Sequence, residues 1–290
     1  MKVTVVGAGI SGLNAALRLQ EAGFSVTVIS DEAAGLPVAM VNPVRGKRGS
    51  VVPRAAEALP LARAVYGRYV ELHPGVWRPV EEEMRPKWRR KLAESEIPHE
   101  WREGGVFLPT AFWLPARQLL AAMKREVALK RGRVVEWNGS RLKLASGGTV
   151  TSDLVVWAGG ARGARVAGMG GRYSPGSQLL VHEYFDQASS HGVFAAGNAL
   201  GGSYLPHLDD YRPHTGRYSE VAWILEKARA LLGYQPRPVG IWSGVRWRLD
   251  GEYLHRHQGG WVIGGFGSTA FLLAPLYAGE LARLIKAETS

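Results

Sequence analysis

The stretch KVTVV at residues 2–6, followed at once by GAGISG at residues 7–12, decides the fold of this chain. The valine-rich run predicts a short buried strand, residues 13–22 have the apolar spacing of a helix, and residues 24–29 predict a second strand. This order of strand, glycine turn, helix and strand is typical of a site for the pyrophosphate of a dinucleotide. The motif alone leaves FAD and NAD(P) open as ligands.

Each glycine of the motif has a separate predicted role. Gly7 allows the tight turn, Gly9 lets the backbone approach the phosphates, and Gly12 lets the helix lie close to the strand. Ile10 and Ser11 open the helix, where free N–H groups and the positive end of the helix dipole favour an anion. The alternative is a glycine turn that serves only the packing of the chain.

The composition is that of an ordinary globular protein, with 290 residues, 46% hydrophobic and 21% charged. The chain has no cysteine, which excludes disulfides, thiolate catalysis, cysteine-bound metals and a flavin attached through a cysteine thioether. No apolar run has the length of a membrane helix, and the predicted strand at the N-terminus leaves no room for a signal peptide. We therefore expect a cytoplasmic protein without a membrane partner.

The formal net charge of +11 suggests anionic partners or simply a basic surface. The densest basic run, at residues 85–91, follows three glutamates at residues 81–83, which favours a solvated surface over an RNA contact. His255 and His257 alternate along a predicted strand and share one face, but the eight histidines show no ligand spacing. We expect no metal site.

The periodicity along the rest of the chain predicts an α/β protein with a partly parallel sheet and a second, more β-rich region. Helices are predicted at 51–72, 114–129, 218–232 and 271–285, and strands at 104–108, 133–137, 141–144, 153–160, 178–185, 192–196, 240–247 and 260–264.

Three further segments favour FAD over NAD(P). Residues 153–160 form an apolar strand that ends in Ala158, Gly159 and Gly160, which allow a close approach from a second side. Residues 38–48 form a loop of mostly small residues that lets a flat ring pass, and in it Asn42 either binds the cofactor or caps the turn before Pro43.

The third segment, residues 261–270, is a strand and glycine loop that enters the last predicted helix. The start of that helix is expected to direct N–H groups at the N1/O2 edge of a flavin. Its candidate cofactor contacts are Gly265, Gly267, Ser268, Thr269 and Ala270.

These segments together resemble the D-amino acid oxidase and glycine oxidase family of flavoproteins. The matching pieces are the glycine loop at 7–12, the strand at 153–160, PGSQ at 175–178, WSGVR at 242–246 and LLAP at 272–275. The segments VNP at 41–43 and GKR at 46–48 look most like an uncharacterised stand-alone branch, itself similar to the oxidase half of an enzyme that modifies wobble uridine in tRNA.

The resemblance implies non-covalent FAD, a Rossmann-type FAD-binding domain, an interleaved and smaller β-rich substrate domain, and oxidation of a C–N bond. We assign residues 1–60, 104–172 and 242–290 to the FAD-binding domain and residues 61–103 and 173–241 to the substrate domain.

The chain departs from the family at two positions. Ser30 stands where the family has a carboxylate that holds the ribose hydroxyls, and Asp31 next to it is the alternative for that contact. The family's Gly-x-Arg-Pro becomes GVRW at 244–247, which loses the proline.

Arg246 and Tyr204 are the candidates for substrate binding. The arginine that matches Arg246 in amino acid oxidases of the family binds the substrate carboxylate, a role that suits a planar guanidinium. Tyr204 follows a glycine pair and either lines the pocket over the flavin or serves packing. A structural salt bridge is the alternative for Arg246.

The sequence thus predicts an FAD-dependent oxidoreductase that oxidises a small amine or amino acid. A hydride would pass to flavin N5, the imine would be hydrolysed, and oxygen or another acceptor would take the electrons. The alternatives are a flavin-dependent oxidase that acts on a modified tRNA base, and a nucleotide-binding protein without catalysis.

Overall fold

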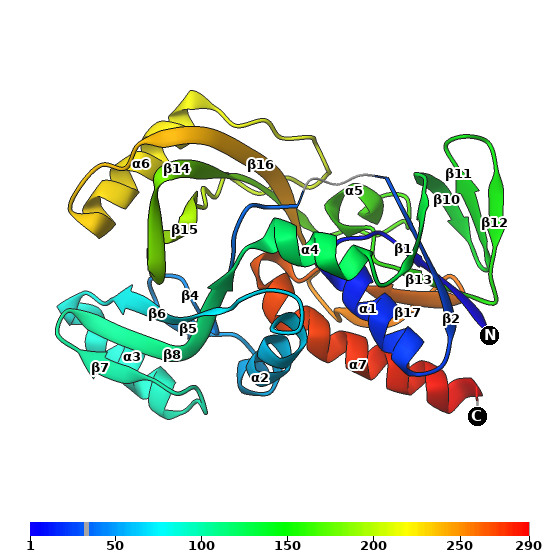
Figure 1. Ribbon diagram of the computed structural model, residues 1–290, viewed down its shortest axis with the longest axis horizontal. Coiled ribbons are helices and arrows are strands. Elements are labelled where there is room, and N and C mark those ends of the chain that lie inside the picture. Colours follow the sequence, from blue (N-terminus) through cyan, green and yellow to red (C-terminus); the bar gives the residue numbers. More distant parts are fainter. Residues whose placement is uncertain (32–34, 290) are drawn as a thin grey trace.

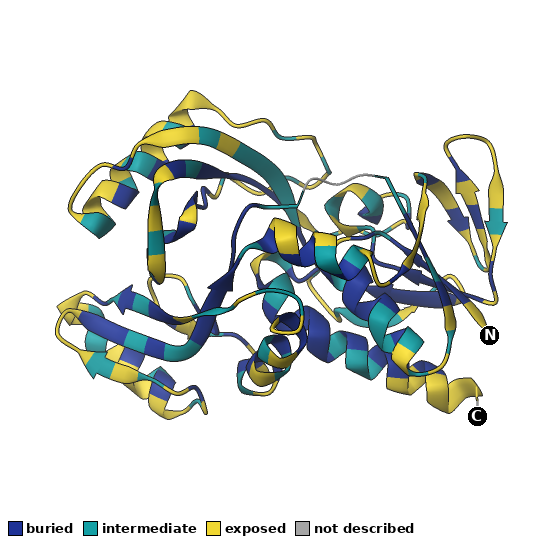
Figure 2. Cartoon of the chain, in the orientation of Figure 1, coloured by how far each residue is buried: buried dark blue, intermediate teal, exposed yellow. Residues whose placement is uncertain are grey.

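The computed structural model describes residues 1–31 and 35–289. Within these residues the chain builds two large sheets that lie beside each other, with helices α1 (Ile10–Glu21) and α7 (Ala270–Thr289) packed together beneath one of them (Figure 1). The most deeply buried strands run through the middle of both sheets (Figure 2).

The first sheet is mostly parallel and contains the strand that begins the chain. Its order is β17 (Leu254–His257), β18 (Gly260–Ile263), β13 (Leu154–Trp157), β1 (Lys2–Val6), β2 (Ser25–Ser30) and β9 (Ala128–Arg131). All neighbours are parallel except β17, which pairs antiparallel with β18. The parallel order explains why β13 is apolar throughout and why β1 is buried from Val3 to Val6, since both faces of these strands are covered.

The two faces of this sheet are covered by different partners. Val3 and Val5 of β1 belong to the core shared with α1 and α7, whereas Val6 packs into a second cluster with Trp137 and Leu142. Those two residues come from a small antiparallel sheet of β10 (Val134–Asn138), β11 (Arg141–Leu144) and β12 (Thr149–Thr151). The alternation follows from the two-residue period of a strand.

The second sheet is mixed and larger. Its path is β15 (Val193–Gly201), β14 (Arg172–His191), β6 (His73–Pro79), β8 (Gly105–Leu114) and β3 (Ala39–Val41), with β16 (Pro238–Arg248) on β14 and β7 (Glu100–Arg102) on β8. Helix α6 (Tyr218–Leu232) packs Ile224 and Ala228 against β14 and β15.

The remaining elements connect or flank the two sheets. They are β4 (Val44–Arg45), β5 (Ser50–Val51), α2 (Ala55–Tyr66), η1 (Glu82–Met84), α3 (Arg85–Ala93), α4 (Ala116–Lys124), α5 (Gly160–Ala164) and η2 (Gly267–Thr269).

The predicted helix at 114–129 is wrong at its C-terminal end. Helix α4 ends at Lys124, and residues 128–131 become the edge strand β9, which pairs parallel with β2. The backbone N–H and C=O groups of residues 128–131 would form hydrogen bonds either in a longer helix or with β2. The pairing with β2 therefore determines that this segment is a strand.

The strands also cross the predicted domain boundaries. Residues 105–114 and 242–248, which the predicted division assigns to the FAD-binding domain, form hydrogen bonds within the second sheet as β8 and β16. β16 pairs with β14 along its whole length, from Arg248 opposite Arg172 to Pro238 opposite Val181. Such distant antiparallel partners leave no local signal in the sequence.

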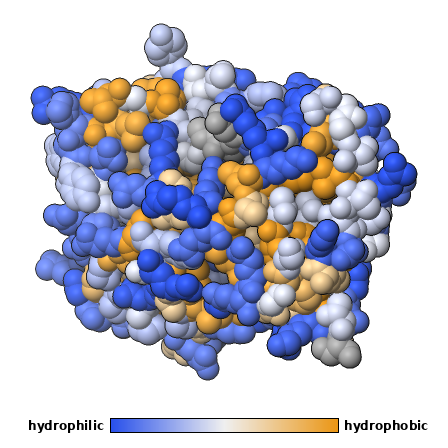
Figure 3. Space-filling model, turned by 45° about the vertical axis from the view of Figure 1, so that its right-hand side comes forward, coloured by the Kyte–Doolittle hydropathy of each residue, from blue (hydrophilic) through white to orange (hydrophobic). Residues whose placement is uncertain are grey.

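No helix in the described ranges is long and apolar enough to cross a membrane. On the face drawn in Figure 3, hydrophobic residues gather around the centre and at the upper left, and mostly hydrophilic residues surround them.

Candidate active site

A cavity of about 920 Å³ lies where the two sheets meet. The start of α1, the end of β13, the loop into α7, the β3–β4 loop and strands β14 and β16 all contribute to its wall. This volume falls in the range of about 300–1,000 Å³ that small-molecule and cofactor sites occupy. No Asp or Glu in the described part of the chain lines it, whereas five Arg and Lys side chains do.

The glycine loop at 7–12 forms one end of the cavity and supports the roles predicted for its glycines. Gly7 has a φ of +104°, and a Cβ there would lie 2.4 Å from the carbonyl oxygen of Ala158. A Cβ on Gly12 would lie 1.9 Å from the carbonyl oxygen of Gly7. A Cβ on Gly9 would meet nothing within 4 Å, and Gly9 lines the cavity. Gly7 and Gly12 therefore permit close packing, while Gly9 leaves space for a ligand.

The N-terminus of α1 has free backbone N–H groups, which favour binding of an anion. Gly9 is the N-cap and supplies no side-chain hydrogen bond, and no acidic residue lies in the first turn. Ile10 and Ser11 also line the cavity, so the first N–H groups of the helix face it. The open space at Gly9 and this uncapped helix start fit a diphosphate group.

The other two predicted glycine loops reach the same cavity. Ala158 and Gly160 line it at the end of β13, whereas Gly159 packs against the indole of Trp157. Of the loop into α7, the lining residues are Gly265, Gly267, Ser268 and Ala270. Thr269 is buried behind them, and its hydroxyl donates to the carbonyl of Phe266 at 2.8 Å.

Asn42 lines the cavity and also caps a turn. Its Oδ1 accepts a hydrogen bond of 2.9 Å from the backbone N–H of Val44. The turn-capping alternative is thus seen directly, while contact with a cofactor stays a prediction.

Ser30 and Asp31 lie outside the residues that line the cavity. The Ser30 hydroxyl donates to the carbonyl of Asp31 at 2.8 Å, and the Asp31 carboxylate pairs with Arg162 at 2.8 Å. The predicted ribose contact at these two residues stays a prediction.

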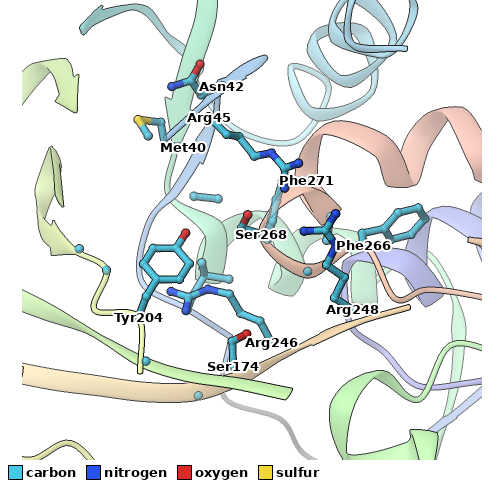
Figure 4. A pocket seen from close by; sticks show the side chains of 18 of the residues that line it. Met40, Asn42, Arg45, Ser174, Tyr204, Arg246, Arg248, Phe266, Ser268 and Phe271 are labelled. Atoms are coloured by element: carbon cyan, nitrogen blue, oxygen red, sulfur yellow. The ribbon is translucent and has the colours of Figure 1, made fainter. Parts of the chain in front are cut away.

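Arg246 and Tyr204 lie together in the wall of the cavity. The guanidinium of Arg246 stacks over the Tyr204 ring at 4.4 Å and donates to the carbonyl of Ser203 at 3.3 Å (Figure 4). A Cβ on Gly176 or Gly202 would lie 2.7 Å from a guanidinium nitrogen of Arg246, so these glycines make room for it. Arg246 pairs with no carboxylate among the described residues.

A buried polar network supports the loop that carries Tyr204. The Glu220 carboxylate accepts hydrogen bonds from Ser203 at 2.5 Å and Ser177 at 3.1 Å, and its other oxygen lies 2.9 Å from Nε2 of His214. Burial raises the pKa of Glu220, but the Ser203 hydrogen bond and the charge of His214 outweigh it and hold the pKa below its usual value. The sequence reading missed this network because its members are far apart in the chain.

Two further arginines in the cavity, Arg45 and Arg248, were not predicted. Arg248 follows Arg246 by two residues on β16, so the period of a strand already places both on one face. For Arg45 the sequence gives no such signal. Its loop is held by the buried Arg78, which donates to the carbonyls of Val44 at 2.5 Å and Gly46 at 2.9 Å. Burial lowers the pKa of Arg78 to about 10, so it stays charged at neutral pH.

The basic run at residues 85–91 forms most of α3 and has largely local contacts. Arg85 pairs with Glu82, Arg89 stacks on Trp101, and the buried Trp88 donates to the carbonyl of Lys47. No cluster in the described ranges has three or more residues able to hold a metal ion.

The comparisons with known proteins identify the family. The sequence profile of DAO, FAD dependent oxidoreductase, matches residues 2–284. A search of curated protein sequences finds no match.

Solved structures share the fold at low sequence identity. Glycine oxidase from Geobacillus kaustophilus superposes with a TM-score of 0.82 at 19% identity, covering 99% of this chain and 94% of its own. Iminodiacetate oxidase from Chelativorans sp. gives 0.75 at 15% identity, covering 98% and 95%. L-proline dehydrogenase from P. horikoshii gives 0.72 at 15% identity, covering 99% and 93%. With the cavity described above, the profile match over nearly the whole chain shows that this protein belongs to the DAO family of FAD-dependent oxidoreductases.

Proposed function

We propose that the protein oxidises the C–N bond of a small amine or amino acid. Bound FAD, held without a covalent link, would accept a hydride from the substrate carbon at N5, after which water hydrolyses the imine. Dioxygen or another acceptor would then take the two electrons.

The observation that carries this proposal is the position of Arg246 in a cavity without lining carboxylates in the described chain. Its guanidinium is held by Tyr204 and Ser203 and has no acidic partner of its own there. A substrate carboxylate would supply that partner, and a planar guanidinium would fix its orientation as well as its charge. Residues of the glycine loops at 7–12 and 265–270 line the same cavity, so a cofactor bound there would lie beside the substrate.

The lining side chains suit hydride transfer from a neutral amine. The cavity offers no carboxylate base from the described residues, and His207 shares a hydrogen bond of 2.7 Å with Ser174. The surrounding guanidinium groups lower the pKa of a bound ammonium group, because like charges disfavour the charged form. The protein thus favours the neutral amine and orients its C–H bond, while the cofactor supplies the redox step.

The backbone at Gly9, Ile10 and Ser11 would bind the pyrophosphate. The N-terminus of α7, at Gly267, Ser268 and Ala270, would stabilise negative charge on the reduced ring.

An anaerobic reduction assay tests the proposed reaction. The purified holoprotein is mixed without oxygen with a panel of amino acids, N-substituted glycines and amines that lack a carboxylate. We expect carboxylate-bearing amines to bleach the flavin absorbance and to yield ammonia or a primary amine together with a carbonyl product. If no amine in the panel bleaches the flavin, the proposed reaction is wrong.

A further inference from the structure

The cavity holds more positive charge than a simple amino acid requires. Of its five cationic side chains, Arg78 is bound to backbone carbonyls and Lys47 lies 3.8 Å from Glu81. Arg45, Arg246 and Arg248 remain, and none of the three has a carboxylate partner among the described residues.

Arg45 and Arg248 are the two to which the proposed function assigns no bound group of the substrate. The Nε of Arg45 is buried and lacks a hydrogen-bond partner within the described structure. The side chain of Arg248 is exposed at the cavity and likewise forms no hydrogen bond or ion pair with the described residues. A cation with no internal partner is available for a ligand, and a buried N–H without one is costly.

The pyrophosphate of the cofactor does not account for these two arginines. The loop that fits the diphosphate offers backbone N–H groups from α1, and neither arginine belongs to that loop. Arg248 instead lies beside the start of α7, since a Cβ on Gly267 would sit 3.6 Å from the Cβ of Arg248.

The three guanidinium groups surround one space from two sides. Arg246 and Arg248 stand on the same face of β16, about 7 Å apart along the strand, while Arg45 comes from the opposite wall. In Figure 4 Arg45 and Arg248 reach toward the region of Ser268 and Phe271, and Arg246 stays beside Tyr204. The positive charge is therefore spread over two places in one chamber.

We infer that the substrate is an amine with two acid groups, one bound by Arg246 and the other by Arg45 and Arg248. This inference rests on the proposed function and specifies its substrate class. An aminodicarboxylate or an imino-linked diacid has the required chemistry, because each anion then meets its own guanidinium group. A substrate with one carboxylate leaves Arg45 and Arg248 without a partner.

Ligand binding to the holoprotein tests the inference without turnover. Acetate and succinate are titrated separately while the flavin absorbance spectrum is followed, and the dissociation constants are compared. The variants are Arg45→Gln and Arg248→Gln, with Arg48→Gln as the matched control. Arg48 is exposed, lies three residues from Arg45 and does not line the cavity. The Arg48→Gln variant therefore removes one positive charge from the same segment without changing the cavity wall.

We expect succinate to bind at least tenfold more tightly than acetate to the wild type and to Arg48→Gln. Each of Arg45→Gln and Arg248→Gln should remove most of that preference while acetate binding changes less than twofold. Equal binding of the two acids by the wild type, or equal weakening of both by the variants, would overturn the inference. If the variants bind both acids equally more weakly and also have a lower flavin reduction potential, the two arginines interact with the cofactor instead of the substrate.

The same preparations separate this result from a failure of the proposed function. If monocarboxylate amines bleach the flavin as efficiently as dicarboxylate amines, the proposed reaction stands and the two-acid substrate is wrong. If no amine of either kind bleaches it, the proposed reaction itself is wrong.

Discussion

At the scale of single residues, Gly12 is tightly packed, whereas Gly9 of the same loop faces open space. A Cβ on Gly12 would overlap the carbonyl oxygen of Gly7, whereas a Cβ on Gly9 would enter open space in the cavity. The same residue type therefore serves packing at one position and ligand access at the other. The GxGxxG spacing predicts both positions, because the motif combines a structural and a binding requirement.

Alanine substitutions separate these two roles. Gly12→Ala should lower the free energy of unfolding of the apoprotein by at least about 1 kcal/mol, because the new methyl group has no room. Gly9→Ala should leave urea unfolding of the apoprotein within about 0.5 kcal/mol, yet weaken FAD by at least about tenfold. Urea unfolding and fluorescence titration with FAD measure the two effects. Unchanged FAD affinity in Gly9→Ala would contradict the role of that space.

The limit of residue-scale prediction is visible at Arg45. Its neighbourhood depends on Arg78, which comes from β6 and binds the carbonyls on both sides of Arg45. Nothing in the local sequence shows that a distant arginine shapes this loop. Arg246, in contrast, lies in the segment at 242–246 that resembles the family, and this resemblance predicts it as a substrate ligand.

At the scale of elements, α6 and β14 are joined by a buried carboxylate. Glu220 lies in the first turn of α6, is 2% exposed, and accepts hydrogen bonds from Ser177 of β14 and from Ser203 in the loop before Tyr204. Because the carbonyl of Ser203 also accepts a hydrogen bond from Arg246, this one side chain links the helix, the strand and the loop that carries Tyr204.

Removal of the Glu220 carboxylate should lower the free energy of unfolding by an amount that depends on pH. The folded pKa of Glu220 lies below its ordinary value of 4.5, so the stabilisation is complete above that value and is lost as the pH falls through the folded pKa. We expect Glu220→Gln to lower the free energy of unfolding by about 2–4 kcal/mol at pH 7. The difference from the wild type should shrink below about pH 4.

Urea unfolding at several pH values measures this difference. Glu226→Gln is the matched control, since Glu226 lies on the same helix and its side chain is 69% exposed in a pair with Lys227. The control should differ from the wild type by less than about 0.5 kcal/mol. A Glu220→Gln effect that grows on acidification would contradict the assigned sign.

Element boundaries show why the sequence predicts some of the fold and not the rest. Helix α6 agrees with the predicted 218–232, because its apolar face meets the second sheet in the ordinary helical pattern. The predicted helix at 114–129 fails after Lys124, because pairing with β2 is a long-range contact. Local periodicity predicts an element that packs one apolar face against a sheet, as α6 does. It fails where pairing with a strand distant in the sequence determines the secondary structure, as in β9.

At the scale of the whole molecule, the cavity lies between two sheets that share the chain in alternating segments. The sequence predicts this interleaving, and its division into domains stays a prediction. β8 and β16, which that division assigns to the FAD-binding domain, pair with strands of the second sheet. A ligand in the cavity contacts elements of both sheets, so its binding energy adds to the stability of the whole fold.

Thermal unfolding with cofactor fragments measures that contribution. At a free FAD concentration of about 1,000 times Kd, the apoprotein should gain about 4 kcal/mol, which raises Tm by several degrees. Riboflavin, which lacks the phosphates, should give a clearly smaller shift at the same concentration, because it cannot use the helix start at Gly9. Equal shifts from both compounds would argue against the diphosphate site.

The most direct test of the central claim is the reductive half-reaction of the wild type and Arg246→Gln under anaerobic stopped flow. We predict that the amino acid which reduces the wild type will bind Arg246→Gln about 100-fold more weakly, a loss of about 3 kcal/mol, because charge-assisted bonds to its carboxylate are lost. Arg246→Lys should recover part of that affinity, and Arg48→Gln should behave as the wild type. An Arg246→Gln variant with intact FAD and the wild-type dissociation constant would contradict the assignment of this cavity as the site where the amine is bound and oxidised.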